Sequence, residues 1–178
     1  MKGSRVSGTR IVGLLHAAFI VKDIDVSVDW YTRVLGLQLV HRQRGDNDYT
    51  RTLVGVEDAV LEVAQFRVPG ASDGISTHML ELIQYVTGAI QSSEAAPPVN
   101  RVGAAHVAFV VTDLGLLHRQ MLTAGAQFVN SPVIVTEGAN RGASACYLRD
   151  PDGNVLELMQ FDESRAERLG ILSTSSHG

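Results

Sequence analysis

The pattern of apolar and polar residues along the chain repeats itself. The stretch LHAAFIVKD at 15–23 matches AHVAFVVTD at 105–113, and both are short, mostly apolar runs typical of β-strands. HMLELIQY at 78–85 and NVLELMQF at 154–161 form a second matching pair of strand-like runs. Because self-similarity along a chain indicates repeated structural units, we predict two modules of the same fold.

A segment with helical periodicity follows the first strand of each half. The apolar residues that share one helix face are Ile24, Val28, Tyr31 and Leu35 in the first half, and Leu114, Leu117 and Met121 in the second. Asp23 and Asp113 precede these segments at the N-cap position. Gly36 and Gly125 follow them, as glycine commonly does where a helix ends. Each half therefore continues from its first strand into a helix.

Two more strand-like runs stand between the helix and the last strand of each half. They are LQLVHRQR at 37–44 and VLEVAQF at 60–66, then AQFVNSPVIV at 126–135 and ASACYL at 143–148. The order predicts an α+β fold made of two tandem βαβββ modules. The expected segments are an N-terminal extension at 1–13, module one at 14–85, a linker at 86–103, module two at 104–162 and a C-terminal tail at 163–178. The insertion GDNDYTRTLVGVED at 45–58 is long enough for a short helix.

Composition and charge narrow the class of protein. The 178 residues are 45% hydrophobic and 19% charged, which is typical of a soluble globular protein with a sizeable core. A net charge of −4 argues against nucleic acid as a partner, and no apolar run is long enough for a membrane span. The start, MKGSRVSGTR, lacks the apolar region of a secretory signal, so we expect a cytoplasmic protein. The single Cys146 is expected to be a small buried hydrophobic residue.

One His and one Glu recur at equivalent places in the two modules. His16 and His106 open the first strand of each module. Glu81 and Glu157 lie between leucines in the last strands, where a carboxylate is costly to bury unless a partner neutralises it. If the first and last strands pair side by side, these side chains can face one cavity. Two imidazoles and two carboxylates suit one divalent ion, such as Zn²⁺, Ni²⁺, Co²⁺, Mn²⁺ or Fe²⁺.

Other polar residues are weaker candidates. Glu62 lies on the third strand of module one, and we expect it to face solvent or to pair on the sheet surface. His78 precedes the strand of Glu81, from where it could orient a metal ligand. The histidines not expected to be ligands are His41, His118 and His177. Loop residues that could line a substrate pocket, or simply be solvated, are Tyr49, Arg51, Asn140 and Arg141.

The segments HAAFIVKDIDVSVDWYTRVLGLQLV and RDPDGNVLELMQF resemble the vicinal oxygen chelate superfamily. That superfamily includes glyoxalase I, methylmalonyl-CoA epimerase, extradiol dioxygenases and the metal-free bleomycin-resistance proteins. The resemblance covers 14–162 and implies that the modules curl into a barrel-like mixed sheet around a metal site. The metal ligands that it implies are His16, Glu81, His106 and Glu157, a set similar to that of bacterial glyoxalase I.

The resemblance also implies an activity. We expect a lyase or isomerase of the glyoxalase type, which moves a proton beside a carbonyl on a small substrate with vicinal oxygens. Either Glu81 or Glu157 can serve as the base, and the resemblance favours Glu157. The alternatives are an Fe(II)-dependent extradiol-type dioxygenase, an isomerase like methylmalonyl-CoA epimerase, and a metal-free protein that binds small molecules such as drugs. The run LIQYVTG after Glu81 differs from the Asn-Trp-Gly of some glyoxalases, which leaves glutathione as a cosubstrate open.

We also expect a homodimer. Modules of this size have open sheet edges and a limited core, and pairing between modules at those edges is a common remedy. The family resemblance points to dimers as well, in which one site can be shared between two chains.

Overall fold

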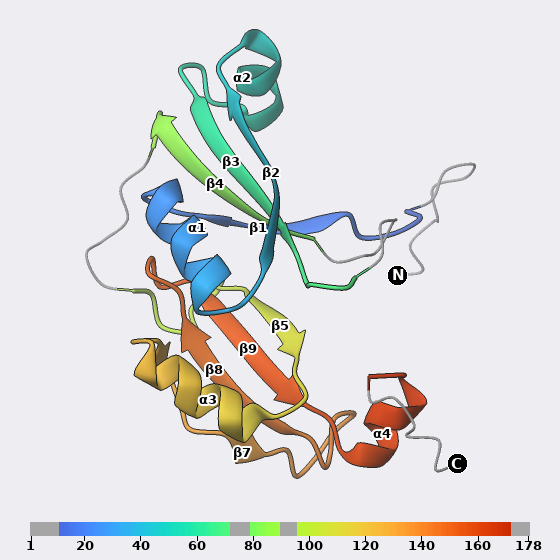
Figure 1. Ribbon diagram of the computed structural model, residues 1–178. Helices are drawn as coiled ribbons and strands as arrows, with labels where there is room; N and C mark the ends of the chain where they lie inside the picture. Colours follow the sequence, from blue (N-terminus) through green and yellow to red (C-terminus); the bar gives the residue numbers. More distant parts are fainter. Residues whose placement is uncertain (1–10, 72–78, 90–95, 172–178) are drawn as a thin grey trace. The chain divides into compact units, whose positions relative to one another are not determined.

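The computed structural model describes residues 11–71, 79–89 and 96–171 (Figure 1). The chain divides into two compact units, one formed by Met1–Ile24 with Gly36–Ala89 and the other by Asp25–Leu35 with Ile90–Gly178. Each unit is built around its own sheet, which is the mixed α+β architecture that the sequence predicts. None of the helices in the described ranges has the length and apolar character needed to cross a membrane.

The first unit contains a four-stranded mixed sheet. Its strands are β1 (His16–Ile20), β2 (Gln38–Gly45), β3 (Val60–Arg67) and β4 (Met79–Thr87). They are ordered β1-β4-β3-β2, with β1 parallel to β4 and the other pairs antiparallel. The first and last strands of the module therefore lie side by side, as predicted.

A short helix occupies the insertion between β2 and β3, which confirms the expectation from its length. This helix is α2 (Asp48–Val54), and Asn47 caps its start by accepting a hydrogen bond from the Thr50 backbone N–H at 2.9 Å. Gly55 ends the helix with a φ of 68°, a left-handed conformation that glycine adopts without steric strain. Val54 of α2 packs against an apolar cluster of Ala59, Leu61 and Val63, as do Val56, Ile83 and Tyr85.

The second unit repeats the strand arrangement. Its elements are β5 (His106–Val110), α3 (Leu114–Thr123), β6 (Gln127–Phe128), β7 (Val133–Ile134), β8 (Ser144–Arg149), β9 (Val155–Gln160) and α4 (Glu163–Arg168). The sheet order is β5-β9-β8-β6, with β5 parallel to β9, and β7 pairs with β8. Both sheets are open within the described residues, so the closed, barrel-like sheet implied by the family resemblance is not formed there.

The strand expected at 126–135 is broken, because β6 and β7 are two separate short strands. Pro132, between them, has no backbone N–H to donate to a neighbouring strand. Asn130 bridges the interruption with its side chain, whose Oδ1 accepts a hydrogen bond from the Tyr147 backbone N–H at 2.9 Å. The side-chain oxygen thus satisfies the β8 donor where the ladder is interrupted.

Helix α1 (Ile24–Arg33) follows β1 in the chain, but residues 25–35 group with the second unit. The Tyr31 side chain is fully buried, and its hydroxyl donates to Asp150 Oδ2 at 2.9 Å. The Ser27 hydroxyl lies 3.4 Å from Asp152 Oδ2 in the same turn. Burial raises the pKa of the Asp150 carboxyl, although hydrogen bonds from Asn154 and Tyr31 oppose the change. A polar network therefore fastens α1 to the turn between β8 and β9.

One part of the apolar core lies on the sheet faces opposite the two glutamates. In the first unit it includes Ala64, Phe66, Leu80 and Leu82, and in the second Cys146, Leu148, Leu156 and Leu158. Cys146 is buried as expected, and its surroundings raise the pKa of the thiol to about 11, chiefly through burial and further through the charge of Glu157. Leu114 and Met121 of α3 are also buried, while Asp113 caps the start of that helix.

Candidate metal centre

The two modules place their His and Glu in the same strand register. In the first unit Ala18 of β1 pairs with Glu81 of β4, and His16 lies two residues before Ala18. Residues two apart on a strand point to the same face, so His16 and Glu81 share one side of the sheet. The second unit repeats this relation, since Ala108 of β5 pairs with Glu157 of β9 and His106 lies two residues earlier. The expected pairing of the first and last strands thus brings each His to its Glu.

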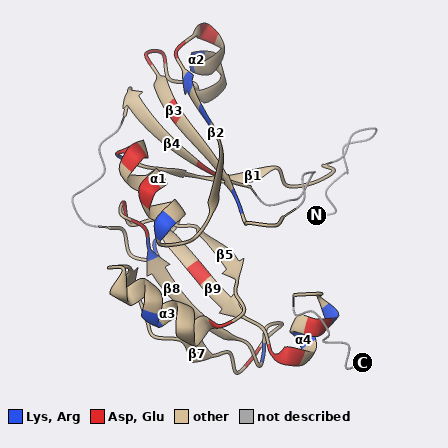
Figure 2. Cartoon of the chain, viewed as in Figure 1, with Lys and Arg blue, Asp and Glu red and all other residues tan. Residues whose placement is uncertain are grey.

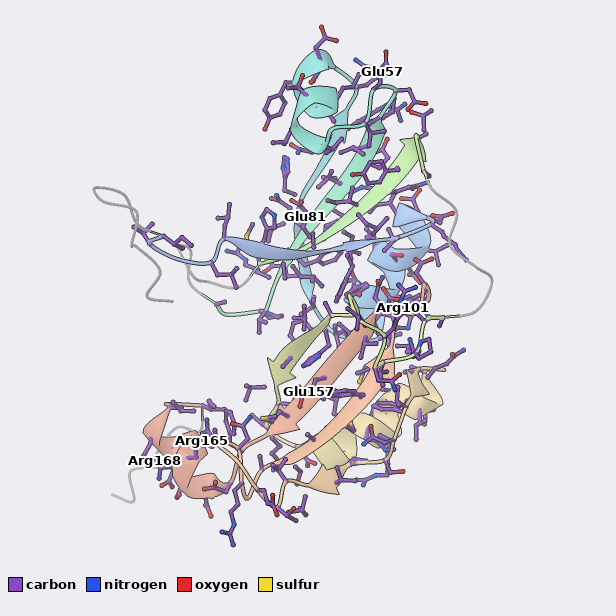
Figure 3. All side chains as sticks on the ribbon, turned by 180° about the vertical axis from the view of Figure 1, so that it is seen from behind. Glu57, Glu81, Arg101, Glu157, Arg165 and Arg168 are labelled. Atoms are coloured by element: carbon purple, nitrogen blue, oxygen red, sulfur yellow. The ribbon has the colours of Figure 1, made fainter. Side chains whose placement is uncertain are left out.

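Each pair is close enough for its polar atoms to act together. His16 Nε2 lies 3.7 Å from Glu81 Oε1, and His106 Nε2 lies 3.2 Å from Glu157 Oε2. The glutamate side chains retain only 12% and 13% of their exposure, whereas the imidazoles are partly open to solvent. Figure 3 marks both carboxylates on their strands, and Figure 2 shows one acidic position within the otherwise uncharged β9. Each of these largely buried carboxylates therefore faces an imidazole. Neither β4 nor β9 carries a Lys or Arg that could neutralise its charge.

The residue across from each glutamate differs between the modules. Gln65 of β3 pairs with Glu81, and its Nε2 donates to Glu81 Oε2 at 2.7 Å. Tyr147 of β8 pairs with Glu157, and its ring centroid lies 5.1 Å from that of His106. Burial raises the pKa of the Tyr147 phenol, and the charge of Glu157 raises it further.

Neither of these neighbours was predicted from the sequence. Gln65 lies in the run VLEVAQF, in which only Glu62 was considered as a candidate site residue. The useful signal is the strand register, because a residue directly across from a buried glutamate is a natural hydrogen-bond partner.

The donor atoms of each pair suit a divalent metal. Two ligands bound to one ion by bonds of about 2.1 Å lie about 3.0 Å apart at a right angle and about 3.4 Å apart in a tetrahedron. The spacing of 3.2 Å in the second unit falls in that range, and the 3.7 Å in the first is slightly wider. His16 Nδ1 is buried and has no hydrogen-bond partner in the described parts of the chain. The imidazole and carboxylate donors therefore fit a metal such as Zn²⁺.

The described residues form two pairs and not one cluster of four. Within 11–71, 79–89 and 96–171, no group of three or more His, Cys, Asp or Glu side chains is placed to hold a metal ion. The structure therefore joins His16 to Glu81 and His106 to Glu157, while the expected set of four ligands stays a prediction.

The remaining candidates lie elsewhere. Glu62 accepts a hydrogen bond from Arg44 at 2.8 Å on the sheet surface, as expected for a residue outside the site. Arg51 lies on α2 and binds Asp46, and the loop residue Asn140 accepts a hydrogen bond from Arg165 through its Oδ1. Tyr49, also on α2, and the loop residue Arg141 are exposed. His78 and His177 lie outside the described residues.

Comparison with known proteins places this architecture in a family. The model of the Glyoxalase/Bleomycin resistance protein/Dioxygenase superfamily matches residues 13–158. A 2-epi-5-epi-valiolone epimerase from Actinomyces sp. is 27% identical over 90% of this chain and 85% of its own length. A protein named "Probable lactoylglutathione lyase" from Vibrio cholerae is 26% identical over 86% of this chain and 94% of its own.

A solved structure agrees with the assignment of the fold. The crystal structure of a glyoxalase family protein from Bacillus cereus has a TM-score of 0.73 and 20% sequence identity. The match covers 88% of this chain and 99% of that one. Since the family match spans most of the sequence, the chain belongs to the Glyoxalase/Bleomycin resistance protein/Dioxygenase superfamily.

Proposed function

We propose that this chain is a divalent-metal-dependent enzyme of the glyoxalase type. It would act as a lyase or isomerase on a small substrate with vicinal oxygens, by moving a proton on the carbon beside a carbonyl. The observation that carries the proposal is the repeated pairing of a largely buried Glu with a His in identical strand register. The proposed ligands of one ion are His16, Glu81, His106 and Glu157, and the ion is Zn²⁺, Ni²⁺, Co²⁺, Mn²⁺ or Fe²⁺.

The metal would act as a Lewis acid that stabilises negative charge on the substrate oxygens when the proton leaves. The two histidines would hold their positions through the strands that carry them. Glu157 would accept the proton on a carboxylate oxygen and return it to carbon. Its strand follows the tight DPDGN turn, which Asp150 stabilises by accepting hydrogen bonds from the backbone N–H groups of Asp152 and Asn154 at 2.9 and 2.8 Å.

The names of the relatives support proton transfer as the reaction class. One is named an epimerase and another a lactoylglutathione lyase. An epimerase inverts one centre, so the proton returns to the carbon that lost it, whereas a glyoxalase-type reaction delivers it to the neighbouring carbon. Both reactions need a base beside a carbon whose neighbouring oxygens are held, and the His–Glu pairs supply groups suited to that task.

A solvent-exchange experiment tests this proposal. Metal-loaded protein is incubated in deuterium oxide with small α-hydroxy carbonyl compounds, and the α-proton is followed by NMR. We expect exchange in the wild type and a loss of about a hundredfold or more in Glu157→Gln, the scale of a lost general base. Glu62→Gln is the matched control, because Glu62 is a β-strand glutamate that pairs with Arg44 on the surface.

Oxygen consumption and metal uptake, measured beside proton exchange, separate the alternatives. Oxygen consumption with catechols, in place of α-proton exchange, would identify an extradiol-type dioxygenase. Wild-type protein that binds small molecules but takes up no divalent ion would be a binding protein. If Glu81→Gln abolishes exchange while Glu157→Gln does not, the two glutamates have the opposite roles.

We further propose that the protein is a homodimer. β1 and β5 stand at the end of their sheet orders, and the equivalent residues Ile20 and Val110 on them are 54% and 49% exposed. Apolar side chains on an open sheet edge favour pairing with another chain. Sedimentation at micromolar concentration should give a dimer, and a monomer would contradict this proposal.

A further inference from the structure

The two His–Glu pairs are equivalent in register but unequal in hydrogen bonding. The position across from the glutamate is Gln65 in the first unit and Tyr147 in the second. An amide can donate to a carboxylate with either N–H, whereas a phenol has one O–H at the far end of a rigid ring. This difference at one position changes how firmly each glutamate carboxylate is held.

Gln65 restrains the carboxylate of Glu81. Its Nε2 donates to Oε2 at 2.7 Å, while the other oxygen, Oε1, faces His16 Nε2 at 3.7 Å. A charge-assisted hydrogen bond of this length is among the stronger ones in proteins. One oxygen is thereby held by the neighbouring strand, and the other is left facing the imidazole with which it would share an ion.

Glu157 has no such restraint. Its Oε2 lies 3.2 Å from His106 Nε2. Apart from that imidazole, the described part of the chain offers its carboxylate no hydrogen-bond donor. Tyr147 packs its ring against the His106 ring instead. The carboxylate can therefore change its rotamer without breaking a bond to a neighbouring strand.

We infer that Gln65 is a positioning residue that fixes Glu81 as the permanent metal ligand and leaves Glu157 as the carboxylate that moves. This inference rests on the proposed metal site and proton transfer. Residues that orient a ligand by hydrogen bonding tune metal affinity, typically by 10- to 100-fold when they are replaced. Gln65 would act only through Glu81, with no contact to the substrate.

The test replaces Gln65 by Met, which keeps the length of the side chain but has no N–H donor. The control is Gln43→Met, the same substitution at an exposed position on β2, the strand next to β3. Co²⁺ affinity is measured by competition with a chelator, and the visible absorption of bound Co²⁺ reports its ligand geometry. We expect Gln65→Met to weaken Co²⁺ binding by about 10- to 100-fold and to change the spectrum. Gln43→Met should change neither.

A double substitution shows whether Gln65 acts through Glu81. In a Glu81→Ala background, Gln65→Met should lower Co²⁺ affinity no further, whereas in a Glu157→Gln background it should have its full effect. Wild-type affinity and spectrum in Gln65→Met, or an equal effect in both backgrounds, would overturn the inference. Failure of the proposed function looks different, because the wild type itself would then bind no Co²⁺ or catalyse no exchange.

Discussion

The hydrogen bond from the Tyr31 hydroxyl to Asp150 holds α1 against the turn between β8 and β9. Tyr31 is fully buried and donates to Asp150 Oδ2 at 2.9 Å. Asp150 is 5% exposed and keeps three other donors, the backbone N–H groups of Asp152 and Asn154 and the Asn154 side-chain amide. Hydrogen bonds to charged groups contribute about 1.5–3 kcal/mol. Since three donors remain, we expect Tyr31→Phe to lower the free energy of unfolding by about 1.5–2 kcal/mol, the low end of that range.

Urea unfolding of the wild type and of Tyr31→Phe measures this difference. In a chain of this size the same change corresponds to a fall in Tm of roughly 3–8 °C. Tyr49→Phe is the control, because Tyr49 is 72% exposed on α2 and its loss should change stability by less than about 0.5 kcal/mol. If Tyr31→Phe unfolds at the same urea concentration and with the same slope as the wild type, the bond to Asp150 does not stabilise the packing of α1.

Three further substitutions test the packing of the second unit. Burial raises the pKa of Asp150, so the folded protein holds that proton more tightly than the unfolded chain does. The stability advantage of the wild type over Asp150→Asn should therefore be largest below the ordinary carboxyl pKa and fall as pH rises through the raised value. Urea midpoints from about pH 3 to pH 6 would show this, and a gap that widens with pH would contradict it. Gly153→Ala should lose about 1–3 kcal/mol in thermal unfolding, because Gly153 has a φ of 87° and an added Cβ would lie 2.6 Å from the Ala96 Cβ. Gln160→Leu should lose about 1 kcal/mol, because Gln160 Oε1 accepts from the Leu114 N–H at 2.8 Å at the start of α3. Unchanged denaturation of either variant would refute that reasoning.

The features that repeat between the modules were predictable from the sequence. The matching runs around His16 and His106, and around Glu81 and Glu157, led to the expectation that the first and last strands lie side by side, and that pairing brings each His to its Glu. A repeated polar residue inside an apolar strand is informative because core packing alone preserves only the apolar positions.

The features that depend on register or on distant contacts were not predictable. Gln65 reaches Glu81 only because β3 and β4 pair in one register, and the length of the intervening loop does not set that register. Tyr31 finds Asp150 at a separation of 119 residues, and no local pattern signals such a contact. The break at Pro132 follows from its missing N–H, a signal that was present in the sequence but was outweighed by the apolar residues around it.

The assembly of the two pairs into one site is a different kind of question. Strand patterns place each His beside its Glu, but they do not state which pairs share an ion. Each pair supplies two ligands, fewer than a divalent metal in a stable protein site usually has. The number of metal ions bound per chain therefore distinguishes one shared site from two separate ones.

The most direct test of a single shared site is the metal content of the purified chain after equilibrium dialysis against Zn²⁺. If both pairs hold the same ion, we expect about one ion per chain in the wild type and a sharp loss of binding in both His16→Ala and His106→Ala. Two ions per chain, with one lost in each variant, would mean that the pairs bind independently. A wild-type chain that takes up no Zn²⁺, and none of Ni²⁺, Co²⁺, Mn²⁺ or Fe²⁺ in the same experiment, would contradict the proposed metal site altogether.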